Sequence, residues 1–213
     1  MPQLKDDYNI FAGQKIQRIE ALSDGVFSIA MTLLVLELSI PFYGAVHSEG
    51  DLWLVLLSTA PKLLVYFMSF ITLGIFWTGQ SLQFTYITKS DRHLNWLTIF
   101  FLMFVALVPF STAFLSEYIV FKLAIGVYWF NILILGIIAY VHWQYACKSG
   151  FISHDIHDFE KADKALRNRI ITAQIFYAIA ASLCFISTYL SIAIIILIQL
   201  NYALAPSFRH KSK

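Results

Sequence analysis

The chain has 213 residues, of which 59% are hydrophobic and 13% are charged, and its formal net charge is +2. This composition excludes an ordinary soluble domain of the same size and indicates a multi-pass membrane protein. Its two cysteines lie in or beside apolar stretches without metal-ligand spacing, so no disulfide framework or metal site is expected from them.

Six apolar stretches predict an all-α integral membrane protein with a single domain, residues 1–213. The expected transmembrane helices cover about 17–41, 52–84, 94–116, 118–146, 168–188 and 190–205. Pro61 is expected either to start the second helix or to kink it, and Pro109 to bend the third. A short surface helix is expected at 158–167, within the hydrophilic segment 148–169.

Charge is distributed unevenly along the chain. Six crossings place both termini on one side, and that side then carries thirteen of the fifteen Lys and Arg residues. The remaining two, Lys62 and Lys122, lie near the opposite helix ends. The positive-inside rule therefore predicts cytoplasmic termini. The outer side instead carries carboxylates that would attract cations: Glu37, Glu49, Asp51 and Glu117.

The first expected helix has distinct faces when successive residues are placed about 100° apart. Apolar side chains fall within an arc of about 60° and form a stripe: Leu22, Ile29, Leu33 and Leu36. About 80° round from this stripe lies a ladder of small side chains, which allows another helix to come close: Ala21, Gly25, Ser28 and Thr32.

The apolar stripe has two interpretations. It faces lipid or neighbouring helices of the same chain, or several copies of the chain meet around one axis, as the small-residue ladder favours. In the second case Ile29, Leu33 and Leu36 form rings around a hydrophobic constriction that opens by wetting.

Asp24 lies on the opposite side from the stripe. A carboxylate this close to hydrocarbon is costly unless it is paired, hydrogen-bonded or hydrated. Asp24 is therefore interpreted either as an acid that holds this helix against its neighbours or as a hydrated group at the membrane interface.

Three further polar features lie in the second half of the chain. The HDIHD segment, residues 154–158, has metal-binding side chains but lacks separated ligand pairs, so a solvated loop is preferred to a metal site. Asn131 and His142 lie within the fourth apolar stretch, where hydrogen bonding between helices is the expected role.

The sequence gives no starting point for an enzyme, since it contains no Gly-rich phosphate loop, Ser/His/Asp arrangement or HExxH run. It also contains no TVGYG-type filter, and the lack of an evident inverted repeat weakens a carrier interpretation. No cofactor and no nucleic-acid partner are expected.

Several residues of the first three helices match a known motif. Arg18, Leu22, Ser23 and Asp24 fit, with one departure, the RxxxFSD pattern that opens the first helix in the transmembrane protein 175 family of potassium channels. Trp77, Asn95 and the VPFST segment, residues 108–112, add to the match. The resemblance is clearest over residues 18–115, and the six-helix layout extends it to the whole chain.

This resemblance implies a potassium-favouring cation channel in the cytoplasmic membrane of a prokaryote. Four identical six-helix chains would surround a pore lined by the first helix, with lipid outside. The implied constriction falls on Ile29, Leu33 and Leu36, and the position tied to potassium preference falls on Thr32. Potassium is the implied permeant ion, and permeation by other monovalent cations is left open.

The resemblance also implies a polar network that holds the pore helix: Arg18, Ser23, Asp24, Trp77, Gln80 and Asn95. Leu22 stands where the family has Phe, and Gln80 stands where members commonly have His. A glutamine can hydrogen-bond to Asp24 or Ser23, but it cannot add a positive charge.

Two alternatives from other classes remain. The first is a proton-coupled or cation-coupled secondary transporter in which Asp24 titrates. The second is a membrane assembly protein without transport activity.

Overall fold

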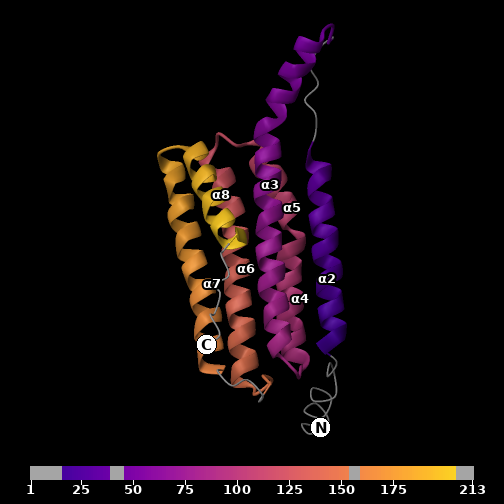
Figure 1. Cartoon of the computed structure of the whole chain (residues 1–213), viewed down its shortest axis with the longest axis vertical. Coiled ribbons are helices and arrows are strands. Elements are labelled where there is room, and N and C mark those ends of the chain that lie inside the picture. Colours follow the sequence, from indigo (N-terminus) through magenta and orange to yellow (C-terminus); the bar gives the residue numbers. More distant parts are fainter. Residues whose placement is uncertain (1–15, 39–45, 154–158, 205–213) are drawn as a thin grey trace, which may run out of the picture.

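The structure, a computed structural model, describes residues 16–38, 46–153 and 159–204. These residues form an elongated bundle in which successive long helices run up and down side by side (Figure 1). Its elements are α2 (Ile16–Leu33), the 3-10 turn η1 (Leu34–Glu37), α3 (Glu49–Tyr86), α4 (Arg92–Ala106), α5 (Val108–Glu117), α6 (Lys122–Lys148), α7 (Phe159–Ser182), the 3-10 turn η2 (Leu183–Phe185) and α8 (Thr188–Leu204).

The helices confirm the all-α membrane fold, with α4 and α5 as the two parts of one interrupted helix. Among the described residues, five helical stretches are long and apolar enough to cross a membrane: Ile16–Glu37, Glu49–Tyr86, Arg92–Glu117, Lys122–Lys148 and Phe159–Phe185. The sixth helix, α8, is also apolar but shorter, with 17 residues.

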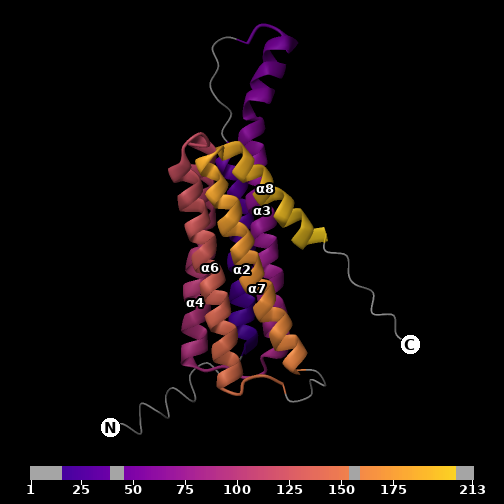
Figure 2. The same cartoon turned by 90° about the vertical axis from the view of Figure 1, so that its left-hand side faces the viewer.

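Proline has different effects in two of the helices. Helix α3 runs for 38 residues with Pro61 inside it, so this proline does not start the helix. The first turns of α3 project beyond the rest of the bundle (Figures 1 and 2). In contrast, α4 ends at Ala106 and Pro109 lies in the first turn of α5, so the helix is interrupted where the bend was expected.

Helix α7 differs from the expected layout. It begins at Phe159 and continues without a break to Ser182, so the surface helix expected at 158–167 is the beginning of the membrane helix. The HDIHD segment, residues 154–158, lies outside the described residues.

Helix α2 lies at the edge of the bundle and buries one face against α3 and α4 (Figure 1). Its buried side chains follow a spacing of three or four residues: Ile16, Ile19, Ser23, Phe27 and Ala30. Phe27 packs against Phe101 of α4 with ring centroids 6.1 Å apart. This single buried face leaves the rest of α2 uncovered by its own chain.

Hydrogen bonds between polar side chains connect the helices inside the bundle. Gln199 of α8 donates from Nε2 to Thr72 Oγ1 of α3 at 2.6 Å. The same hydroxyl of Thr72 lies 3.0 Å from the hydroxyl of Tyr128 in α6. Hydrogen bonds in an apolar interior have little competition from water, so they fix α8 against α3 and α6.

Both polar residues singled out in the fourth apolar stretch bond to neighbouring helices. His142 Nδ1 lies 2.8 Å from Gln83 Oε1, and His142 Nε2 lies 3.1 Å from Thr98 Oγ1. Asn131 donates from Nδ2 to Ser111 Oγ at 3.3 Å. These contacts confirm the prediction of hydrogen bonding between helices.

Candidate pore-lining surface

The apolar stripe of α2 and η1 is uncovered in the single chain. Leu22, Ile29, Leu33 and Leu36 are 47%, 60%, 41% and 73% exposed, whereas Leu34 between them is fully buried. The exposed fractions of these leucines and of Ile29 differ this much because the bundle packs against a single face of α2.

The small-residue ladder is also exposed, and it lies almost opposite the buried face of α2. A side chain added at Gly25 would meet nothing within 4 Å. The ladder and the adjoining stripe therefore form one continuous surface on which another helix has room to pack.

Thr32 lies on this exposed surface with its hydroxyl partly engaged. Its Oγ1 donates to the backbone oxygen of Ile29 at 2.8 Å. Because a hydroxyl has one hydrogen and two lone pairs, the Thr32 oxygen keeps acceptor capacity toward the outside of the helix.

Asp24 bonds to the neighbouring helix. Trp77 of α3 donates from Nε1 to Asp24 Oδ1 at 2.8 Å, and both side chains are exposed in the single chain. Ser23, next to Asp24, is buried and donates to the backbone oxygen of Ile19 in its own helix at 3.0 Å. The contact between Asp24 and Trp77 therefore fastens α2 to α3 beside the uncovered surface.

The other residues of the implied network do not gather around Asp24. Gln80 is only 7% exposed, and its Oε1 has no hydrogen-bond partner in the described part of the chain. It lines a cavity together with residues of α6 and α7. Arg18 lies exposed near the start of α2. Within one chain, the described structure therefore joins Asp24 with Trp77 and places Gln80 elsewhere.

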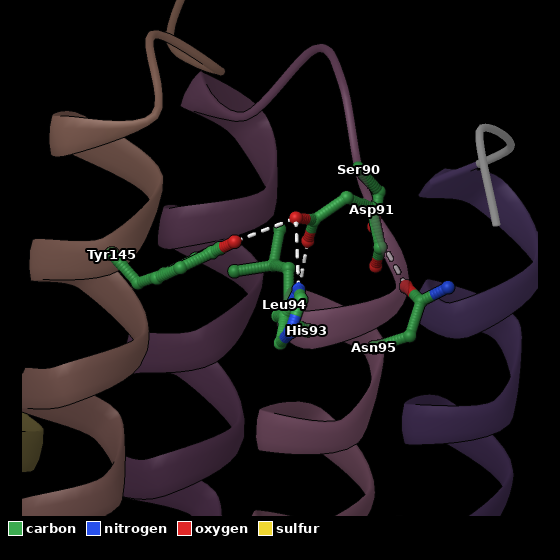
Figure 3. Close-up of polar contacts among 6 residues, drawn as sticks. All are labelled: Ser90, Asp91, His93, Leu94, Asn95 and Tyr145. Carbon is green, nitrogen blue, oxygen red and sulfur yellow. Dashed lines mark hydrogen bonds and ion pairs between the residues drawn. The ribbon is translucent and has the colours of Figure 1, made fainter. Parts of the chain in front are cut away.

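Asn95 lies in the first turn of α4, beside α2. Its amide nitrogen points toward α2, while its Oδ1 accepts a hydrogen bond from Ser90 Oγ at 2.7 Å (Figure 3). Ser90 precedes the helix, so this contact fixes the orientation of Asn95 from the turn between α3 and α4.

Asp91 organises the same turn and was not singled out from the sequence. Its Oδ1 accepts from the Leu94 backbone N–H at 2.8 Å and so caps α4. Tyr145 of α6 donates to Asp91 Oδ2 at 2.6 Å, and His93 Nδ1 lies 3.6 Å from the same oxygen (Figure 3). An Asp just before the first turn of an expected helix is a helix-start signal and would have identified the cap.

The opposite end of the bundle contains an ion pair. Lys62 of α3 lies 2.9 Å from Glu117 at the end of α5. Glu49 and Asp51 lie in the first turn of α3, where Ser48 caps the helix. Glu49 and Asp51 therefore lie at the projecting start of α3, whereas Glu117 lies beside Lys62, farther along the same helix.

The fold defines the class of this protein: it is a multi-pass, all-helical membrane protein. A family model described as endosomal/lysosomal potassium channel TMEM175 matches residues 18–109. Together with the relatives and the solved structure described next, this match shows that the chain belongs to the TMEM175 family.

Relatives that match nearly the whole chain place it beside the prokaryotic members. A potassium channel of Streptomyces collinus is 33% identical over 189 residues, covering 87% of this chain and 90% of the relative. A potassium channel of Chamaesiphon minutus is 33% identical over 190 residues, covering 88% and 93%.

A solved structure is similar over the same extent. The crystal structure of a lysosomal potassium-selective channel TMEM175 homolog from Chamaesiphon minutus matches with a TM-score of 0.77 and 30% identity. The match covers 89% of this chain and 97% of that one. The chain is thus similar to a whole channel subunit in fold as well as in sequence.

Proposed function

We infer that this protein is a potassium-favouring cation channel of a prokaryotic cell membrane, built from four copies around a central pore lined by α2. The potassium channels named among its relatives cover almost its full length, which favours a channel over a coupled transporter. The same family membership argues against an enzyme.

The observation that carries the proposal is the uncovered surface of α2. Leu22, Ile29 and Leu36 are about half exposed or more. They adjoin the polar side chains of the small-residue ladder, which lipid would not solvate. Four copies meeting through the small-residue ladder would cover this surface and turn its apolar stripe toward a shared axis.

In that assembly Ile29, Leu33 and Leu36 form successive apolar rings. These side chains offer no oxygen ligands, so an ion would pass them with part of its hydration shell. The constriction would close to ions when the water inside the rings is lost. Thr32 lies about 60° round the helix from Ile29, so its hydroxyl reaches the pore if α2 rotates on opening. Its oxygen keeps acceptor capacity and would then give a partly dehydrated cation one protein ligand.

The ends of the pore differ in charge. With the termini in the cytoplasm, as the Lys and Arg distribution favours, Glu49, Asp51 and Glu117 lie on the outer side. Glu117 is paired with Lys62, which leaves Glu49 and Asp51 at the start of α3 to raise the local concentration of cations on this side.

The test is potassium flux in liposomes for the wild-type protein beside Ile29→Asn. A polar ring at the constriction holds water, so Ile29→Asn should increase the flux. Ile179→Asn is the matched control, because Ile179 of α7 is 55% exposed and Ile29 is 60% exposed. Equal fluxes for wild type and Ile29→Asn, or the same increase in Ile179→Asn, would count against Ile29 as part of the gate.

A further inference from the structure

A cavity away from the α2 surface opens between α3, α6 and α7. Its volume is about 80 Å³, and its walls are mainly apolar. Tyr202 near the end of α8 contributes to its rim. A cavity of this size has room for several water molecules or for a small polar group of a larger ligand.

Two of the side chains that line this cavity carry an unpaired oxygen. Gln80 of α3 and Gln174 of α7 both line it, and the Oε1 atom of each is buried with no hydrogen-bond partner among the described residues. Leaving a buried acceptor unpaired costs about 1–3 kcal/mol. An oxygen of this kind accepts hydrogen bonds only, so the cavity suits an occupant that brings hydroxyl or N–H donors.

The position of Gln174 depends on a glycine in the facing helix. A Cβ at Gly136 of α6 would overlap the Gln174 amide, so only glycine allows Gln174 to come this close. Gln174 Nε2 donates to the backbone oxygen of Ile132 at 3.3 Å, which leaves its Oε1 unpaired. His142 also lines the cavity, but both of its ring nitrogens already have partners.

Arg169 of α7 gives the cavity a positive charge. It is exposed, and its guanidinium carbon lies 5.8 Å from the centre of the Tyr202 ring. No ion pair of Arg169 occurs among the described residues. A planar guanidinium with free donors matches the oxygens of a phosphate group.

Arg169 also marks the boundary between the polar and apolar parts of α7. It lies about 15 Å along the helix from Phe159, and no Asp, Glu, Lys or Arg occurs from Ile170 to Leu204. This places the guanidinium at the level where lipid headgroups meet hydrocarbon.

An apolar groove adjoins the cavity. It lies between α6 and α7, has a volume of about 420 Å³, and shares Gly136, Ile170 and Gln174 with the cavity. The rest of its lining includes Leu133, Ile137, Ile171 and Ile175. A groove of this composition suits an acyl chain, which a soluble phosphate does not have.

We propose that the cavity between α3, α6 and α7 binds the headgroup of an anionic, hydroxyl-bearing phospholipid of the phosphatidylglycerol type. Arg169 contacts the phosphate, and the headgroup hydroxyls donate to Gln80 and Gln174, while an acyl chain follows the α6–α7 groove. This site is separate from the α2 surface and does not depend on the proposed pore.

The experiment titrates the full-length protein in detergent with phosphatidylglycerol and, separately, with phosphatidylcholine of the same acyl chains. The thermal midpoint of unfolding reports binding, since a ligand of the folded state raises it. Phosphatidylglycerol should bind about tenfold more tightly than phosphatidylcholine. Arg169→Gln and Gln80→Leu should each reduce this preference severalfold.

Lys148→Gln is the matched control, because Lys148 is an exposed cation at the end of α6 that does not line the cavity. It should keep the wild-type preference. If Arg169→Gln fails to fold, Arg169→Lys takes its place; this variant keeps the charge but loses the planar fork, and it should weaken the preference.

Three results would overturn the proposal. The first is equal affinity for the two lipids, as a cavity filled only by water would give. The second is a loss of the preference for phosphatidylglycerol in Lys148→Gln as large as that in Arg169→Gln. Where Arg169→Lys is used instead, an unchanged preference in that variant has the same meaning. The third is equally tight binding of glycerol phosphate without acyl chains, which would identify a soluble anion as the ligand. Because none of these readouts involves ion flux, they are independent of the pore.

Discussion

The contact between Asp24 and Trp77 predicts a measurable coupling between α2 and α3. The Trp77 N–H donates to a carboxylate oxygen at 2.8 Å, and hydrogen bonds to charged groups contribute about 1.5–3 kcal/mol. Hydrogen bonds between membrane helices average about 0.6 kcal/mol, with a maximum of about 1.7 kcal/mol. Because both side chains are exposed in the single chain, we expect a coupling energy of about 1–1.5 kcal/mol.

A double-mutant cycle measures this energy. Asp24→Ala removes the acceptor, Trp77→Phe removes the donor but keeps a large ring, and unfolding in mixed micelles gives the free energy of each variant. Asp24→Asn is the control, since its side-chain oxygen still accepts from Trp77 and should keep part of the coupling. If the two single effects add within about 0.5 kcal/mol, the contact does not hold α2 in place.

The same contact has a functional consequence. Since Asp24 anchors the helix that carries the proposed constriction, Asp24→Ala should damage assembly or opening more than ion selectivity. Recordings of potassium and sodium currents, together with the size of the purified complex, separate these effects. Intact oligomers that differ from wild type in selectivity alone would contradict the positioning role of Asp24.

Three other substitutions have defined outcomes. Thr32→Val should lower the preference for potassium over sodium in flux assays, whereas Thr32→Ser, which keeps the hydroxyl, should retain it; equal selectivity in both variants would exclude the hydroxyl as a ligand. Gly136→Ala should be about 1–3 kcal/mol less stable than Gly126→Ala in thermal unfolding, because only the first introduces a Cβ into the Gln174 amide. Similar midpoints for the two alanine variants would show that Gln174 moves at no cost. His142→Leu should cost about 1–3 kcal/mol because it leaves a buried partner unpaired, and unchanged stability would show that water replaces the ring.

The long apolar stretches and their periodicity were sufficient to predict the membrane fold. Helix formation within lipid depends on local composition, so the all-helical architecture and an irregularity at Pro109 could be predicted from the sequence. The exposure of Ile29 and Leu36 also agrees with the face assigned from the 3.6-residue period. Whether that face lines a pore depends on other copies of the chain, which periodicity alone does not reveal.

The lateral contacts could not be predicted from one sequence. Gln80 has the spacing from Trp77 that the family motif implies, yet its side chain lies in a cavity with Gln174, nearly a hundred residues away in the chain. The partners of His142 likewise come from two other helices. Such pairings follow from how helices rotate and pack against one another, and a helical pattern fixes only which residues share a face.

The continuity of α3 and α7 also required the structure. A proline inside an apolar stretch predicts either a helix start or a kink in a helix that began earlier. The structure excludes the start, because α3 begins at Glu49 and continues past Pro61, whose missing backbone hydrogen bond is tolerated in a membrane helix. In α7, the charged residues before Arg169 have the pattern of a separate surface helix. The structure shows that they form the first turns of the same helix that continues through the apolar region.

The orientation of α2 in the assembled protein is the central test. A structure of the full-length protein in lipid nanodiscs would show the number of chains and the direction of each side chain of the stripe. We predict four chains, with Ile29, Leu33 and Leu36 facing a common axis and the small-residue ladder at the contacts between copies. A single chain, or an assembly whose Ile29 and Leu33 side chains face lipid, would contradict conduction through a pore lined by α2.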